Sequence, residues 1–233
     1  MTMTTTTKKK SQFEGIPKEG FAFLKKLKKN NDRDWFQPRK HEYEAKLKEP
    51  MLALIEQLGR EMRSIAPEIR FTPKSLLRIY RDTRFAKDKT PYKTHVAATF
   101  DMVGYPKSVS SPGFYLHVEP GEVYVGGGLY MPDSRQLKRI RYAIEQKSES
   151  FLAIVEDPQF KRFFGKLQGE TLKRAPAGYS PEHPMIEYLK RKGFFVGKSF
   201  DESLIHSSKA VPKLVDAYTR IVPLTRWLRD NSR

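Results

Sequence analysis

Residues 76–95 read LLRIYRDTRFAKDKTPYKTH, and the rest of the chain is expected to be organised around this stretch. The segment 76–81 carries branched and aromatic side chains, whereas residues 82–83 and 88–91 are typical of turns. Thr90 precedes a proline, which biases it toward an extended conformation. The pattern predicts a strand near 76–81, a loop, and a second strand near 94–100.

The same stretch concentrates positive charge. Its six cationic side chains are Arg78, Arg81, Arg84, Lys87, Lys89 and Lys93. Only Asp82 and Asp88 oppose them. Guanidinium groups match carboxylate or phosphate, and lysines add mobile point charges, so this composition favours an anion site. The predicted ligand contacts are Arg78, Arg81, Arg84, Lys89 and Lys93 for charge, and Tyr92 for stacking or a hydroxyl contact. The alternative is structural, with the two aspartates pairing with arginines and bracing the loop.

The whole chain is basic, but unevenly so. It has 233 residues, with 44 Lys and Arg against 27 Asp and Glu, a net charge of +17. Residues 70–100 hold eight basic and two acidic side chains, whereas residues 101–150 hold six of each. Such a charge favours anionic partners, with nucleic acid first and phosphorylated small molecules or acidic lipid surfaces after it.

Composition also bounds the class of protein. The chain lacks cysteine, which excludes disulfides, thiolate zinc sites and cysteine nucleophiles and fits a cytoplasmic protein. It contains no apolar run long enough to span a membrane, and its start lacks the apolar core of a secretory signal. Residues 1–12 are predicted to be a disordered basic tail, and residues 13–233 a single domain.

Strands are predicted in the middle of the chain and helices toward both ends. Residues 113–119 alternate apolar and polar side chains and lead through a Pro-Gly turn into a strand near 122–128. Residues 40–65 repeat apolar positions at helical spacing, with a kink or a break expected at Pro50, and a last helix is expected over 208–228. This segregation predicts an α+β fold with a mostly antiparallel sheet covered mainly on one face by helices.

The motifs of common cofactor and metal sites are missing. The glycine run 126–128 matches neither the P-loop nor the dinucleotide fingerprint, so a strand bend is preferred and no cofactor is expected. The five histidines lie far apart in sequence, so no metal site is predicted from their spacing. A fold can still gather His95, His117 and Glu119, because they lie on strands predicted to be neighbours.

Three motifs carry a family resemblance. They are RDTRFAKDKTPYKTH at 81–95, GFYLHVEPG at 113–121 and VGGGLY at 125–130, with NDRDWF at 31–36 in support. With these motifs the chain resembles a conserved family of uncharacterised bacterial and fungal proteins that is known as a domain of unknown function. The resemblance covers nearly all of the chain after residue 12, and it implies no activity, cofactor or catalytic set.

Three hypotheses for function follow from these residues. The first is a binding module for a phosphate-bearing or other anionic ligand, with nucleic acid as one such ligand. The second is an enzyme acting on a phosphorylated or carboxylated small molecule, with His95 or His117 as proton carrier and Asp82 or Asp88 orienting a partner. The third is an interaction scaffold in which the charged residues only brace the sheet.

Overall fold

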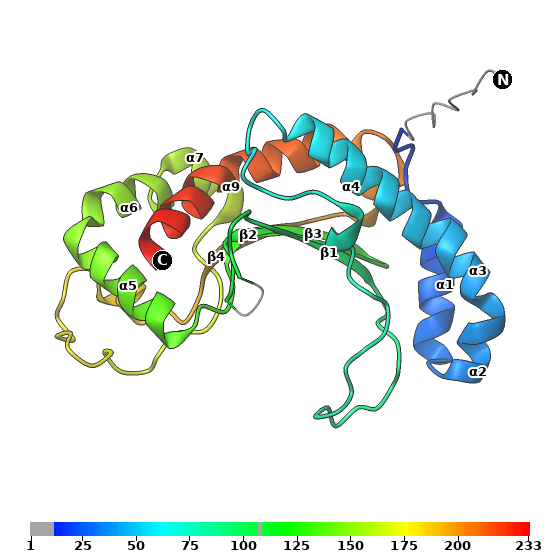
Figure 1. Cartoon of the computed structure of the whole chain (residues 1–233), viewed down its shortest axis with the longest axis horizontal. Coiled ribbons are helices and arrows are strands. Elements are labelled where there is room, and N and C mark those ends of the chain that lie inside the picture. Colours follow the sequence, from blue (N-terminus) through cyan, green and yellow to red (C-terminus); the bar gives the residue numbers. More distant parts are fainter. Residues whose placement is uncertain (1–11, 107–108) are drawn as a thin grey trace, which may run out of the picture.

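One antiparallel sheet forms the middle of the molecule, with helices on one of its faces and at its ends (Figure 1). The structure is a computed structural model that describes residues 12–106 and 109–233. The predicted tail 1–12 therefore lies outside the described residues, except for its last position. The architecture confirms the predicted α+β class.

The sheet has four strands in sequential order. They are β1 (Val96–Asp101), β2 (Gly113–Glu119), β3 (Glu122–Leu129) and β4 (Phe194–Phe200). The turn between β2 and β3 contains Gly121, whose φ of +97° is a conformation that glycine adopts without a steric penalty. The strands predicted near 94–100, 113–119 and 122–128 are confirmed.

Alternation along the strands gives the sheet one buried face. Phe114, Leu116 and Val118 of β2 are at most 3% exposed, and the residues between them are half-buried on the opposite face. The glycine run 126–128 lies inside β3, where Gly128 departs from extended geometry with a φ of +126°. The buried face is therefore continuous, and the other face carries the polar side chains.

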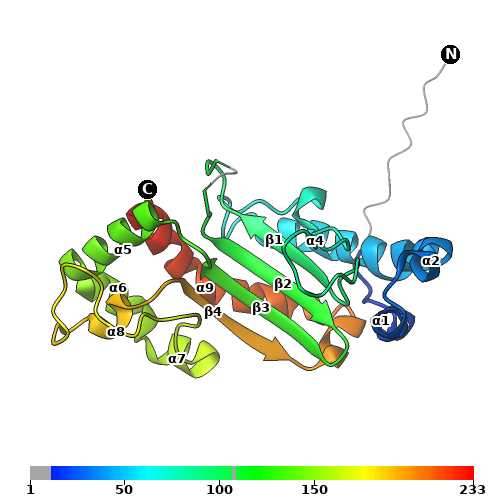
Figure 2. The same cartoon turned by 90° about the horizontal axis from the view of Figure 1, so that it is seen from below.

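Helix α9 (Ala210–Ser232) packs on the buried face. The Tyr218 ring stacks on Phe114, with ring centroids 4.7 Å apart, and meets Phe100 edge-on at 5.9 Å. A Cβ at Gly127 would lie only 2.8 Å from Ile221, so this glycine permits the close approach of helix and strand. Figure 1 shows α4 and α9 above the sheet, and Figure 2 shows the opposite face uncovered by helices over β2 and β3.

The N-terminal helices lie at one end of the sheet, and the last of them, α4, extends over its covered face (Figure 1). They are α1 (Lys18–Lys29), α2 (Arg33–Phe36), α3 (Lys40–Tyr43) and α4 (Glu49–Glu61). A π-helical segment, Glu44–Lys48, separates α3 from α4, and Pro50 lies in the first turn of α4. Because proline has no N–H and its ring crowds the preceding turn, the expected disturbance appears here as a π-helical turn, and the helix continues through it without a break.

The helices between β3 and β4 pack at the other end. They are α5 (Ser134–Gln146), α6 (Ser148–Val155), α7 (Pro158–Phe164) and α8 (Ile186–Leu189). The side chain of Asp133 caps α5 by accepting a hydrogen bond from the Gln136 N–H at 2.8 Å. Among the described residues, no helix combines the length and apolar character needed to cross a membrane.

The predicted strand near 76–81 is wrong, because this segment divides its pairing between two partners. Leu76 bridges to Ala98 of β1, whereas Tyr80 bridges to Tyr92 further along the chain. Each of these pairings is an isolated β-bridge, so neither continues as a strand. The Tyr80–Tyr92 bridge instead closes a hairpin that extends beyond the sheet, and residues 78–95 are called the basic hairpin below.

Candidate functional site

The two aspartates of the basic hairpin are each paired with an arginine. Asp82 accepts two hydrogen bonds from the Arg84 side chain, at 3.0 and 2.7 Å. Asp88 lies 2.5 Å from Arg81 and also accepts the Thr90 N–H at 2.9 Å. The Thr90 N–H, with Arg81 and the Thr90 hydroxyl, lowers the pKa of Asp88 to about 2. These bonds are of the kind that the structural hypothesis predicts.

Two lysines of the hairpin are bound to backbone carbonyls. The Lys89 ammonium donates to the carbonyl of Thr83 at 2.9 Å, and the Lys93 ammonium donates to that of Arg78 at 2.9 Å. Partial burial, with a contribution from the Arg78 charge, lowers the pKa of Lys93. In the part of the chain that the structure describes, the exposed side chains of Arg78 and Lys87 make no hydrogen bond or ion pair.

Tyr92 anchors the base of the hairpin in the core. Its ring is 1% exposed and stacks on Phe36, with centroids 4.1 Å apart. Its backbone exchanges two hydrogen bonds with the side-chain amide of Asn31, at 2.9 and 3.0 Å. The predicted stacking of Tyr92 on a ligand would require the ring to leave Phe36. This packing fixes the hairpin base to the connection between α1 and α2.

A cavity of about 350 Å³ lies between α1 and the hairpin base, and we call it the basic cavity. Its lining residues are Lys28, Asn31, Arg81, Asp88, Thr90, Tyr92, Lys93, Thr94 and His95. Three of these side chains are cationic and one is a carboxylate. Because Asp88 is already paired with Arg81, the positive charges of Lys28 and Lys93 are less compensated than that of Arg81.

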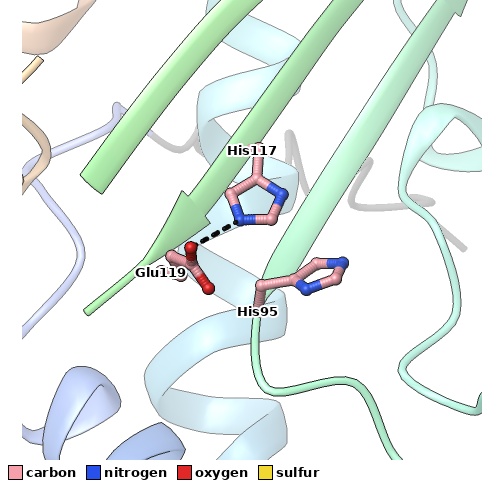
Figure 3. A group of neighbouring side chains, drawn as sticks. All are labelled: His95, His117 and Glu119. Carbon is pink, nitrogen blue, oxygen red and sulfur yellow. Dashed lines mark ion pairs between the residues drawn. The ribbon is translucent and has the colours of Figure 1, made fainter. Parts of the chain in front are cut away.

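His95, His117 and Glu119 form a cluster at the edge of this cavity, which we call the histidine cluster (Figure 3). His117 and Glu119 alternate onto the open face of β2, and His95 immediately precedes β1. The register pairs Val96 with Val118, which places His95 across from Glu119. The open ends of two neighbouring strands therefore bring the cluster together.

Hydrogen bonds and ring contacts order the cluster. His117 Nε2 lies 3.5 Å from a Glu119 carboxylate oxygen, and its Nδ1 lies 3.1 Å from the Tyr115 hydroxyl. The rings of His95 and His117 have centroids 4.3 Å apart. Burial, followed by the nearby His117 and Lys93, lowers the pKa of His95 to about 4, so its imidazole is neutral at pH 7.

A second hollow of about 410 Å³ adjoins the cluster on the open face of the sheet. Its side chains are mainly aromatic, and its lining residues are Thr99, Tyr115, Tyr124, Gly127, Gly128, Tyr130 and Phe195. The Tyr124 ring lies over Gly197 of the neighbouring strand. A Cβ at Gly197 would be only 2.0 Å from the Tyr124 hydroxyl. Glycine at this position thus makes room for a ring on the open face, and Tyr115 joins this hollow to His117.

The structure brings His95, His117 and Glu119 together, an arrangement that the sequence permits without predicting a metal site. Asp82 and Asp88 bond to arginines, and the carboxylate beside His117 is Glu119. Sequence reasoning did not identify Tyr115 and Tyr124, although strand alternation places both on the face of His117. It also missed Lys28 and Asn31, for which no local signal exists, since they reach the hairpin only through tertiary packing.

Comparison with known proteins assigns the family. A family model described as "Conserved hypothetical protein (DUF2461)" matches residues 19–227, so the chain belongs to this family. No curated protein and no solved structure matches the chain.

Proposed function

For this member of the DUF2461 family, we propose a binding function for a small anionic ligand that carries phosphate or carboxylate groups and occupies the basic cavity. The observation that carries the proposal is the lining of the cavity, which combines three cationic side chains with one carboxylate that is already paired. Its volume of about 350 Å³ falls within the ordinary range of small-molecule sites.

Lys93 is the residue on which anion binding should depend most. Its ammonium is partly buried, and burial lowers its pKa, so the charged form lacks full solvation. An anion in the cavity would replace the missing water with a charge-assisted hydrogen bond. Thr94 lines the same space and carries a hydroxyl that can donate, whereas Asn31 donates to the Tyr92 carbonyl and the Thr90 hydroxyl donates to Asp88. The cavity therefore supplies both charge and hydrogen-bonding groups.

Nucleic acid would use a different surface of the same hairpin. Phe85 is 95% exposed, and the neighbouring Arg84 and Lys87 are exposed as well. A strand of nucleic acid contacting these residues would displace several counterions, so its affinity would fall steeply with salt. A small ligand in the cavity would contact Lys28 and Lys93 and leave the hairpin end free.

The test is a calorimetric titration with pyrophosphate and with a short single-stranded oligonucleotide, each at several salt concentrations. Lys93→Gln should weaken pyrophosphate binding by about tenfold, since one charged hydrogen bond contributes roughly 1.5 kcal/mol. Lys87→Gln is the matched control, because Lys87 is an exposed hairpin lysine that does not line the cavity. If pyrophosphate does not saturate the wild type, or binds both variants equally, the proposal is wrong.

A second candidate is an enzyme that acts on the same ligand. The observation that favours it is His95, which lines the basic cavity and also contacts His117 of the histidine cluster. Cationic groups beside a reacting phosphate or carboxylate would stabilise developing negative charge. Turnover of generic phosphoesters by the wild type, lowered in Lys93→Gln and retained in Lys87→Gln, would support this candidate.

A further inference from the structure

The histidine cluster places three metal-binding side chains together. One ligand atom from each of His95, His117 and Glu119 can be chosen so that all lie within 4.8 Å of one another. Donors in a tetrahedral zinc shell lie no more than about 3.5 Å apart, so the farthest pair must approach by at most roughly 1.3 Å. Rotation of partly exposed side chains can provide this movement.

The donor set has a defined chemical preference. Two imidazoles and one carboxylate are the protein ligands of many catalytic zinc sites and of the facial triad that binds ferrous iron. Both kinds of site leave coordination positions open to an exogenous ligand. All three side chains come from the ends of adjacent strands, which hold their backbones in a fixed register.

Tyr115 supplies the outer contact that metal-bound histidines commonly have. Its hydroxyl lies 3.1 Å from His117 Nδ1, so an N–H at Nδ1 can donate to it. Nε2 would then be free of hydrogen and would face Glu119, which lies 3.5 Å away. The side chain of His117 is only 17% exposed, so its ring orientation is restricted by packing as well.

The structure also offers a simpler account of the cluster, in which Glu119 only orients His117 by a hydrogen bond. That account explains the 3.5 Å contact. It does not require His95, whose ring lies 4.3 Å from that of His117 in a partly buried position. Two imidazoles and a carboxylate held this close on a polar sheet face make a ligand set. The Lys93 charge acts near His95 and opposes a cation, so an anion in the basic cavity would favour metal binding.

We propose that His95, His117 and Glu119 bind one divalent transition-metal ion of the zinc and ferrous iron class. The site does not depend on the anionic ligand proposed above. Because His95 lines the basic cavity as well, an anion bound there is placed to approach an open position of the metal.

Cobalt and zinc are the probes for this site. Chelator-treated full-length protein is titrated with Co²⁺, whose visible absorption reports its coordination, and the bound cobalt is then displaced with Zn²⁺. The wild type should bind about one equivalent with nitrogen and oxygen coordination. His95→Ala, His117→Ala and Glu119→Gln should each weaken binding by about tenfold or more, and Tyr115→Phe by about tenfold.

A matched control lies elsewhere in the chain. His183 lies 3.9 Å from Glu145, so this pair reproduces one imidazole and one carboxylate without a second histidine. His183→Ala should bind cobalt like the wild type. Unfolding curves recorded without metal show whether a variant has lost only its metal ligands or its folded structure as well. Absence of cobalt binding in the wild type, or equal binding by a folded His95→Ala and His117→Ala double variant, overturns the metal site. Neither result affects the pyrophosphate titration.

Discussion

The two faces of the sheet differ in what their side chains contact. On the helix-covered face, Leu116 and Phe114 are buried, and Tyr218 of α9 stacks on Phe114. On the open face, Tyr115 and His117 alternate with these same residues but remain half-buried and hydrogen-bonded. One strand therefore supplies stability through one set of side chains and candidate chemistry through the other. Substitutions on the two faces should have different consequences.

The largest effect is expected from Leu116→Ala on the covered face. Leu116 is fully buried, so the substitution removes apolar contacts and leaves a cavity. The free energy of unfolding should fall by about 2 to 5 kcal/mol, measured by urea denaturation. Tyr115→Phe is the control from the open face, where loss of one hydroxyl should cost no more than about 1.5 kcal/mol. Similar losses in the two variants would remove the distinction between the faces.

Gly128→Ala should have the next largest effect. A Cβ at this position would lie 2.2 Å from the backbone carbonyl oxygen of Phe194, and its φ is +126°. Strain and displacement of β4 should lower the free energy of unfolding by roughly 1 to 3 kcal/mol. Gly121 also has a positive φ, but nothing lies within 4 Å of an added Cβ. Gly121→Ala therefore measures the cost of the positive φ alone. If Gly121→Ala is the more damaging variant, contact with β4 is not the cause.

The same contrast explains how much the sequence could predict. Alternation in residues 113–119 was enough to identify both faces of β2, and it also implied that His117 and Glu119 lie together. The neighbouring strand then brought His95 to them through register. The pairing of residues 76–81 was not predictable locally, because Leu76 and Tyr80 bridge to different segments. The basic cavity depends in the same way on α1, which lies about fifty residues before the hairpin in sequence.

A smaller effect is expected at Asp88 in the hairpin that borders the open face. Its folded pKa of about 2 is below the ordinary value of 3.8, so its bonds stabilise the folded state above pH 3.8. That contribution is lost as the pH falls through about 2. Asp88→Asn should therefore melt slightly below the wild type at pH 5, and the difference should shrink toward pH 2.

A carboxyl titration by NMR tests the cause directly. The Asp88 carboxyl should titrate near pH 2 in the wild type and return toward 3.8 in Arg81→Gln, since Arg81 supplies part of the shift. Asp82 is a suitable internal reference, because its pKa is lowered mainly by Arg84 and should not change. An Asp88 carboxyl that titrates at 3.8 in the wild type would mean that its bonds to Thr90 and Arg81 do not persist in solution.

Arg84→Ala should have the smallest effect on stability and bears on the scaffold hypothesis. The Arg84 side chain is 77% exposed and its partner Asp82 is 46% exposed, so removing the arginine leaves no buried charge without a partner. Exposed ion pairs of this kind contribute little, and the melting temperature should stay unchanged. A fall of several degrees would show that this pair braces the fold. An unchanged melting temperature together with weaker oligonucleotide binding would instead assign Arg84 to ligand recognition at the hairpin end, apart from the cavity that Lys93 lines.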